Sequence, residues 1–129
     1  VRHSILVFQQ EVILNKTKRN FSEAVINLQK IAEKEILLGD YQKALSTLNE
    51  AIKIQKDFKL SNIEIKTLCF YAIALFKLGH INNSLFFVEK ANAKINSNSD
   101  NHEKALVLST KAEILYHQRN LVKSKQLYE

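Results

Sequence analysis

Apolar side chains recur along this chain at spacings of three and four residues, with polar side chains between them. Two stretches that show the spacing are Leu68, Ala72, Leu75 and Leu85, Val88, Ala91. This period places apolar side chains on one face of a helix. The chain has only two glycines and no proline, too few turn-forming residues for a many-stranded sheet. The sequence therefore predicts an all-α fold.

The pattern also repeats at a fixed interval. Gly39 and Gly79 lie 40 positions apart, and each follows a leucine and precedes a polar residue. Other columns at this interval keep the size of their side chain: Leu28, Leu68, Leu108; Ala32, Ala72, Ala112; Tyr41, Ile81, Leu121; and Ala44, Ser84, Ser124. Repetition of this kind is typical of an array of stacked helical units.

Each unit is predicted to hold two helices. The break between them is expected at Gly39 and Gly79, because glycine readily takes the left-handed conformation that ends a helix. In the third unit the break is expected at Arg119 and Asn120. Capping-box pairs mark the unit starts: Asn20 with Glu23, Ser61 with Glu64, and Asp100 with Glu103. We expect first helices near 21–38, 62–78 and 101–118, and second helices near 41–57, 81–96 and from 121 onward.

The predicted organisation is a single repeat domain over residues 1–129, with units at about 21–57, 61–96 and 101–129. Residues 1–14 are expected to form the second helix of a preceding unit, because Ile5 and Phe8 fall 40 positions before Leu45 and Leu48. At the other end the pattern stops in mid-helix. We therefore expect a section cut at both ends from a longer array.

These columns resemble the tetratricopeptide repeat, in which a bulky residue precedes a small one in the first helix and small residues recur in the second. The matching residues are Leu28, Leu68 and Leu108, then Ala32, Ala72 and Ala112, the turn residues Gly39 and Gly79, and Ala44, Ala51, Ser84 and Ala91. A period of 40 in place of about 34, and the lack of a closing proline, mark a long variant. The resemblance implies a right-handed α-α superhelix of about three helix pairs plus one leading helix.

The resemblance further implies a protein that binds other proteins, not an enzyme. Stacked helix pairs present an extended concave surface, which first-helix residues line in this family. By position, the partner-binding residues would be Gln29, Glu33, Ile36, Lys66, Cys69, Phe70, Ile73, Phe76, Glu113 and Tyr116. We expect an apolar or amphipathic partner segment to pack on Phe70, Ile73 and Phe76, with Glu33 and Glu113 at its flanks. An alternative interpretation is that neighbouring units cover these rings as core.

Residues suited to catalysis or metal binding are few and scattered. His3, His80, His102 and His117 do not pair with one another or with Cys69 at the spacing of a metal site. Both glycines are accounted for as turns, which leaves no phosphate-binding loop. A single cysteine cannot form an intramolecular disulfide, which favours a reducing compartment, cytoplasm or nucleus. We expect no catalytic residue, cofactor, metal or small-molecule substrate.

A net charge of +6 makes nucleic acid a candidate partner. The lysines that dominate this charge are spread over every unit, however, without interleaved aromatic or arginine residues for stacking or base contacts. The longest apolar stretch, 68–76, is far shorter than the roughly 20 residues that span a bilayer. Three functions stay open: a scaffold section of a multi-subunit assembly, which we favour; a peptide- or signal-sensing region of a transcriptional or signalling regulator; and weak nucleic-acid binding.

Overall fold

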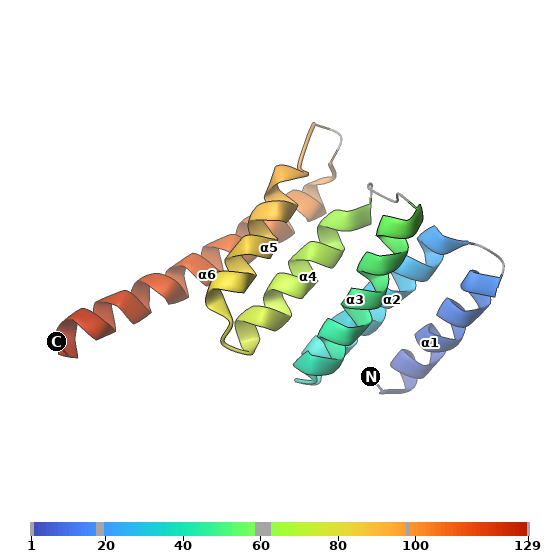
Figure 1. Cartoon of the computed structure of the whole chain (residues 1–129), viewed down its shortest axis with the longest axis horizontal. Coiled ribbons are helices and arrows are strands. Elements are labelled where there is room, and N and C mark those ends of the chain that lie inside the picture. Colours follow the sequence, from blue (N-terminus) through green and yellow to red (C-terminus); the bar gives the residue numbers. More distant parts are fainter. Residues whose placement is uncertain (1, 18–19, 59–62, 98, 129) are drawn as a thin grey trace.

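The computed structural model describes residues 2–17, 20–58, 63–97 and 99–128 (Figure 1). Within these ranges the chain is all-helical, as predicted, and has no strand. The helices are α1 (Arg2–Thr17), α2 (Phe21–Leu37), α3 (Tyr41–Phe58), α4 (Glu64–Lys77), α5 (Ile81–Ala93) and α6 (Asn101–Tyr128). The first five begin and end within three residues of the predicted bounds.

Helices α2 and α3 form a hairpin whose turn depends on Gly39. Its φ of +82° lies in the left-handed region that favours glycine. The Gly39 N–H donates to the Ile36 carbonyl at 3.0 Å, and the Asp40 N–H donates to the Glu35 carbonyl at 2.9 Å. These bonds satisfy carbonyls at the end of α2 that have no partner within the helix. The predicted helix break at Gly39 is confirmed.

Helices α4 and α5 form a second hairpin with the same turn. Gly79 has φ +88°. The two bonds recur 40 residues later, from Gly79 to the Phe76 carbonyl at 3.0 Å and from His80 to the Leu75 carbonyl at 2.9 Å. Residues 41–50 of α3 and 81–90 of α5 also have the same degree of burial at every position. The predicted 40-residue interval is therefore present in these two hairpins.

Helix starts agree with two of the three predicted caps. The Asn20 side-chain oxygen accepts a hydrogen bond from the Glu23 N–H at 3.4 Å, and Asp100 accepts one from the Glu103 N–H at 2.7 Å. Helix α4 begins later than predicted, after Ile63, whose side chain makes no capping bond. The expected cap for this helix, Ser61, lies outside the described residues.

The prediction of a third helix pair is wrong. Helix α6 runs unbroken from Asn101 to Tyr128, through the expected break at Arg119 and Asn120. Neither residue is glycine, so a left-handed turn there would carry the steric cost of a Cβ atom, and the right-handed helix continues. The described chain consists of two hairpins, with α1 before them and α6 after them.

The 40-residue columns also fail in α6. Leu108 is 64% exposed and Ala112 is exposed as well, although their counterparts in α2 and α4 are buried. The side chains that α6 buries are Val107, Thr110 and Ile114. In the described residues α6 has no hairpin partner and packs against α4 and α5, so these two helices decide which face is buried.

Apolar side chains form two core clusters. The α1–α3 core consists of Val12, Ala24, Val25, Leu28, Ile31, Ala51 and Ile54. The α4–α6 core consists of Ile65, Leu68, Cys69, Ala72, Val88, Ala91, Val107 and Ile114. The two cores correspond to the two halves of the molecule in Figure 1, each built around one hairpin.

A buried polar network joins the two hairpins. The Gln29 Nε2 donates to the Thr67 Oγ1 and to the Ile63 carbonyl, both at 2.8 Å. The Thr67 hydroxyl in turn donates to the Gln55 Oε1 at 2.6 Å. Because α2, α3 and α4 each contribute one of these buried side chains, the network fixes the second hairpin against the first.

Candidate protein-interaction surface

The three helices predicted as first helices of the units lie next to one another. Helix α4 packs between α2 and α6 and contacts both (Figure 1). Their outward residues therefore form one continuous surface, here called the α2–α4–α6 surface. The residues predicted for partner binding all belong to these three helices.

Two of those residues are buried, and their predicted role is wrong. Cys69 is 0% exposed in the α4–α6 core. Burial, with a smaller contribution from the Glu103 charge, raises the pKa of the Cys69 thiol to about 12, so the thiol stays protonated at neutral pH. Gln29 is also buried, and its amide is engaged in the network with Thr67. Cys69 is fully covered, and Gln29 has little exposed area left for a partner docked on the surface.

The predicted apolar strip lies along α4. Phe70, Ile73 and Phe76 are all partly buried, so each keeps some accessible area. Phe76 packs against the α4–α6 core and meets the ring of His117 edge-on, at 5.3 Å between ring centres and 88° between planes. Phe76 thus agrees in part with the alternative interpretation that these rings are core. Phe70 and Ile73 remain the side chains of the strip that a partner could pack on.

Charged and aromatic groups gather where the end of α4 meets α6. The Lys77 Nζ lies 3.9 Å from the Glu113 Oε1, and both side chains are well exposed. The same ammonium lies 5.8 Å from the centre of the Phe76 ring. Tyr116, 69% exposed, is close by on α6. An exposed ion pair of this kind stabilises the fold by at most about 1 kcal/mol, so its partners are free to exchange with groups on another protein.

The other end of the surface is hollowed. A cavity of about 180 Å³ is lined by Ile26, Gln29, Ile63, Lys66 and Glu103, which come from α2, the start of α4, and α6. Burial, helped by Asp100, raises the pKa of Glu103, whereas the Lys66 charge lowers it. Lys66 was predicted here, but Glu103 was predicted only as a capping residue. Of the remaining predicted residues, Glu33 is exposed and Ile36 partly buried, toward the end of α2.

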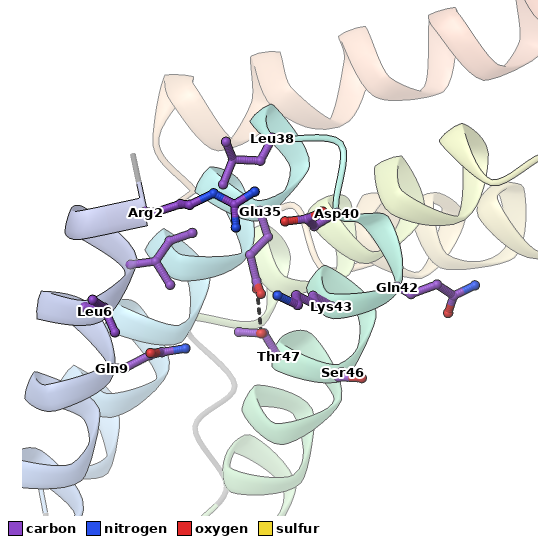
Figure 2. A pocket seen from close by; sticks show the side chains of 11 residues that line it. Arg2, Leu6, Gln9, Glu35, Leu38, Asp40, Gln42, Lys43, Ser46 and Thr47 are labelled. Atoms are coloured by element: carbon purple, nitrogen blue, oxygen red, sulfur yellow. Dashed lines mark hydrogen bonds between the residues drawn. The ribbon is translucent and has the colours of Figure 1, made fainter.

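A larger cavity lies between α1, α2 and α3 and was not predicted from the sequence. Its volume is about 640 Å³, and its lining includes Arg2, Ile5, Leu6, Leu38, Asp40 and Lys43. Figure 2 shows the Glu35 side chain directed toward Thr47, with Arg2 and Leu6 on the α1 side. The Thr47 hydroxyl donates to the Glu35 Oε1 at 2.6 Å. Glu35 is only 5% exposed, so this cavity contains a buried carboxyl group.

The charges around Glu35 act in opposite directions. Burial is the largest influence and raises the pKa of the carboxyl group. The hydrogen bond from Thr47 and the charge of Lys43 lower this pKa, and the charge of Asp40 raises it. One comparison within the sequence could have found the site, because the residue 40 positions after Glu35 is Leu75. A glutamate at a position that buries leucine in the next unit is a local exception to the repeat.

The described part of the chain shows neither a cluster of metal-ligating side chains nor a helix suited to crossing a membrane. In ranges 2–17, 20–58, 63–97 and 99–128, no group of three or more histidine, cysteine, aspartate or glutamate side chains is placed to hold a metal ion. Among the helices that the structure describes, none has the length and apolar character needed to cross a bilayer.

Comparison with known proteins gives one local similarity. No family model matches the chain, and no solved structure matches it significantly. A stretch of 63 residues is 40% identical to synaptonemal complex protein 1 of Rattus norvegicus and, over the same length, 41% identical to that of Mus musculus. Each match covers 45% of this chain and 6% of the relative. The similarity is confined to a small part of the length of these relatives.

Proposed function

We propose that this chain is a non-enzymatic protein-interaction module of a larger multi-subunit assembly. It binds an apolar or amphipathic segment of a partner protein along the α2–α4–α6 surface. The observation that carries the proposal is the placement of Phe70 and Ile73, two partly accessible apolar side chains, between a charged group at each end of the surface. Lys66 and Glu103 stand at one end, and Lys77 and Glu113 at the other.

This arrangement suits an amphipathic segment for two reasons. Apolar side chains of the segment gain free energy by covering Phe70 and Ile73, at about 25 cal/mol for each Å² removed from water. Charges at the rim select and orient a partner more than they add affinity. Of the residues expected to contact the partner, Gln29 and Cys69 are left out because they are buried.

The proposal takes the two hairpins as units of a TPR-like superhelix. Its support is the 40-residue interval, the matching left-handed turns at Gly39 and Gly79, and the contacts of α4 with both α2 and α6. Helical repeats of this kind are built to offer an extended binding surface. The relatives that match part of the chain are named as proteins of a complex, which agrees with a role in assembly. With its lone cysteine buried as a thiol, the chain fits a cytoplasmic or nuclear location.

A second candidate function is a peptide- or signal-sensing region of a regulator. One observation favours it, namely the cavity of about 640 Å³ between α1, α2 and α3. A preformed hollow of this size is more than a simple scaffold needs.

The test places a photo-crosslinking residue at position 73 or at position 86 of the full-length protein in cells. Phe86 is the matched control, because it is apolar and 59% exposed but lies on α5, away from the proposed surface. We expect position 73 to crosslink to one defined segment of a partner, and Phe70→Ser to abolish that crosslink while Phe86→Ser leaves it intact. Equal crosslinking from both positions would show that the α2–α4–α6 surface has no special role.

A further inference from the structure

The cavity between α1, α2 and α3 has a counterpart in the second hairpin that allows a direct comparison. The Glu35 and Leu75 carbonyls accept the same bond at the helix end, each at 2.9 Å, from Asp40 and His80 respectively. Both side chains are buried at this position. The hairpin therefore folds with leucine there, and its turn does not require a carboxyl group.

Burial of the carboxyl group opposes stability. Moving an ionised carboxylate out of water costs free energy unless hydrogen bonds or opposite charges replace the water. At Glu35 the replacement is the 2.6 Å bond from Thr47, together with the charge of Lys43. A carboxylate can accept about four hydrogen bonds, so Glu35 retains the capacity to bind a further donor that carries positive charge.

The second hairpin has an aromatic side chain where the first has a threonine beside the cavity. Phe87 stands at the position of Thr47, and its ring lies 4.5 Å from that of Tyr71 and 5.4 Å from that of Phe86, centre to centre. The smaller threonine, with Ser46 beside it, borders a cavity of about 640 Å³ instead. This volume lies within the roughly 300–1,000 Å³ range of small-ligand sites.

The walls of the cavity combine charge and apolar area. Ile5 and Leu6 from α1 and Leu38 from the end of α2 supply apolar side chains. Figure 2 shows Leu6 and Leu38 on different sides of Glu35. A ligand with a short hydrocarbon chain and one positively charged end would match both parts.

We propose that this cavity binds an alkylammonium group, with the ammonium on the Glu35 carboxylate and the hydrocarbon chain against Ile5, Leu6 and Leu38. An ammonium group has three hydrogen-bond donors, and the nearby Asp40 adds negative charge on the same side. Lys43 opposes the ligand and Arg2 lines the same cavity, so binding depends on the buried carboxylate outweighing these cations. The group is supplied by a free amine or by a lysine side chain of another protein. The inference does not depend on the α2–α4–α6 surface.

The first experiment titrates the whole chain, labelled with ¹⁵N, with n-butylammonium chloride while backbone amide shifts are recorded. We expect saturable shifts at Lys43 and Thr47, with little change at Asn83 and Phe87, the matching positions of the second hairpin. The controls are n-butanol and butyrate, which have a similar hydrocarbon chain without the positive charge. Equal binding of n-butanol, preferred binding of butyrate, or no saturable shift with the ammonium would overturn the proposal.

A second titration separates the two sources of the group. A tripeptide with blocked ends, glycine-lysine-glycine, presents the alkylammonium group as a protein does. Binding of the tripeptide with the same shifted amides assigns the cavity to a lysine of a partner. Binding of n-butylammonium alone assigns it to a small amine, because the peptide backbone is then excluded.

Variants test the role assigned to each charge. Glu35→Gln keeps an oxygen for Thr47 but removes the negative charge, and we expect affinity for n-butylammonium to fall about tenfold or more. Lys43→Gln removes the competing cation and should raise affinity roughly twofold to fivefold. Glu33→Gln, on an exposed position of the same helix, is the control and should change nothing.

Glu35→Leu guards against a misfolded variant. It copies the residue of the second hairpin at Leu75, so we expect a well-dispersed amide spectrum and no binding. Unchanged affinity in both Glu35 variants, or weaker binding of n-butylammonium in Lys43→Gln, contradicts the assignment of the ammonium to Glu35.

Discussion

The two hairpins share a backbone design but bury different chemistry. Their turns have the same left-handed glycine and the same pair of hydrogen bonds, and the starts of their second helices are buried to the same degree at every position. Inside, the first hairpin encloses Glu35 and Thr47 beside a cavity, whereas the second encloses Leu75 and Phe87. The backbone of a helical hairpin is thus compatible with either interior, and the side chains decide which hairpin has room for a ligand.

The difference also separates stability from binding. Apolar side chains that fill their space contribute to the free energy of unfolding without needing a partner group. A buried carboxyl group beside a cavity contributes less and leaves an unused hydrogen-bonding capacity. We therefore regard the second hairpin as the supporting half of the molecule and the first as the half with a ligand site. Four predictions test this division.

The largest change in the free energy of unfolding is expected in the core of the first hairpin. We take this core to be well packed despite the cavity beside it. Leu48 is fully buried and holds the position of Val88 in the second hairpin. Leu48→Ala should lower the free energy of unfolding by about 2–5 kcal/mol, measured by urea denaturation. Leu37→Ala, at a position that is 69% exposed, should change it by less than about 0.5 kcal/mol. Similar small losses from both variants would mean that the first hairpin is loosely packed throughout.

The next effect concerns the contact between the hairpins. Thr67→Val keeps the shape of the side chain but removes the hydroxyl that accepts from Gln29 and donates to Gln55. The Gln55 Oε1 then loses this donor, the Gln29 amide keeps only its bond to the Ile63 carbonyl, and the free energy of unfolding should fall by about 1–3 kcal/mol. Thr110→Val is the matched control, because that buried hydroxyl donates only to the Leu106 carbonyl of its own helix. An equally large loss in the control would indicate that the network adds nothing specific.

Sequence periodicity predicted the backbone of the hairpins more fully than the chemistry inside them. Glycine recurs at positions 39 and 79 because each turn needs a residue in the left-handed conformation. This requirement is local, so it can be recognised in the sequence. The prediction of a helix break at Asn120 is wrong, because the absence of glycine there favours a continuous helix. The prediction that Leu108 is buried like Leu28 and Leu68 is wrong for a different reason. The helices that pack against α6, and not the sequence of α6 itself, decide which of its faces is buried.

The candidate sites show the same limit. Gln29 and Cys69 occupy first-helix positions of the kind that face a partner in the resembled family, yet here neighbouring helices engage or cover both. The position of a residue within the repeat does not predict whether a neighbouring helix buries its side chain, because that burial depends on contacts between residues far apart in the sequence. Glu35 went unnoticed for the converse reason. The alignment with Leu75 identifies it, but a single glutamate in a helix otherwise predicts an exposed position.

The two turns allow a test in which both hairpins should respond alike. At both Gly39 and Gly79, a Cβ atom would meet nothing within 4 Å, so replacement by alanine changes only the cost of the positive φ. We expect Gly39→Ala and Gly79→Ala each to lower the free energy of unfolding by about 1–2 kcal/mol. The two losses should agree within about 0.5 kcal/mol, measured by urea denaturation under the same conditions. A clear inequality would show that the turns differ in strain, despite the same hydrogen bonds.

The smallest effect, the pH dependence of Glu35, is the one that distinguishes the interiors. Burial raises the pKa of this carboxyl group in the folded protein above its ordinary value of 4.5. The folded state then binds the proton more tightly than the unfolded state does, so stability from this group is present below the unfolded pKa and is lost as pH rises through the folded pKa. Glu35→Gln cannot ionise and should gain stability relative to the wild type over that pH window, then keep a constant difference above it. The measurement is urea denaturation at a series of pH values, with exposed Glu33→Gln as the control that should follow the wild type. A constant difference in the free energy of unfolding between Glu35→Gln and the wild type at every pH would contradict this prediction. It would mean that the carboxyl group ionises as freely in the folded protein as in the unfolded chain, and that burial does not distinguish the interior of the first hairpin from the apolar interior of the second.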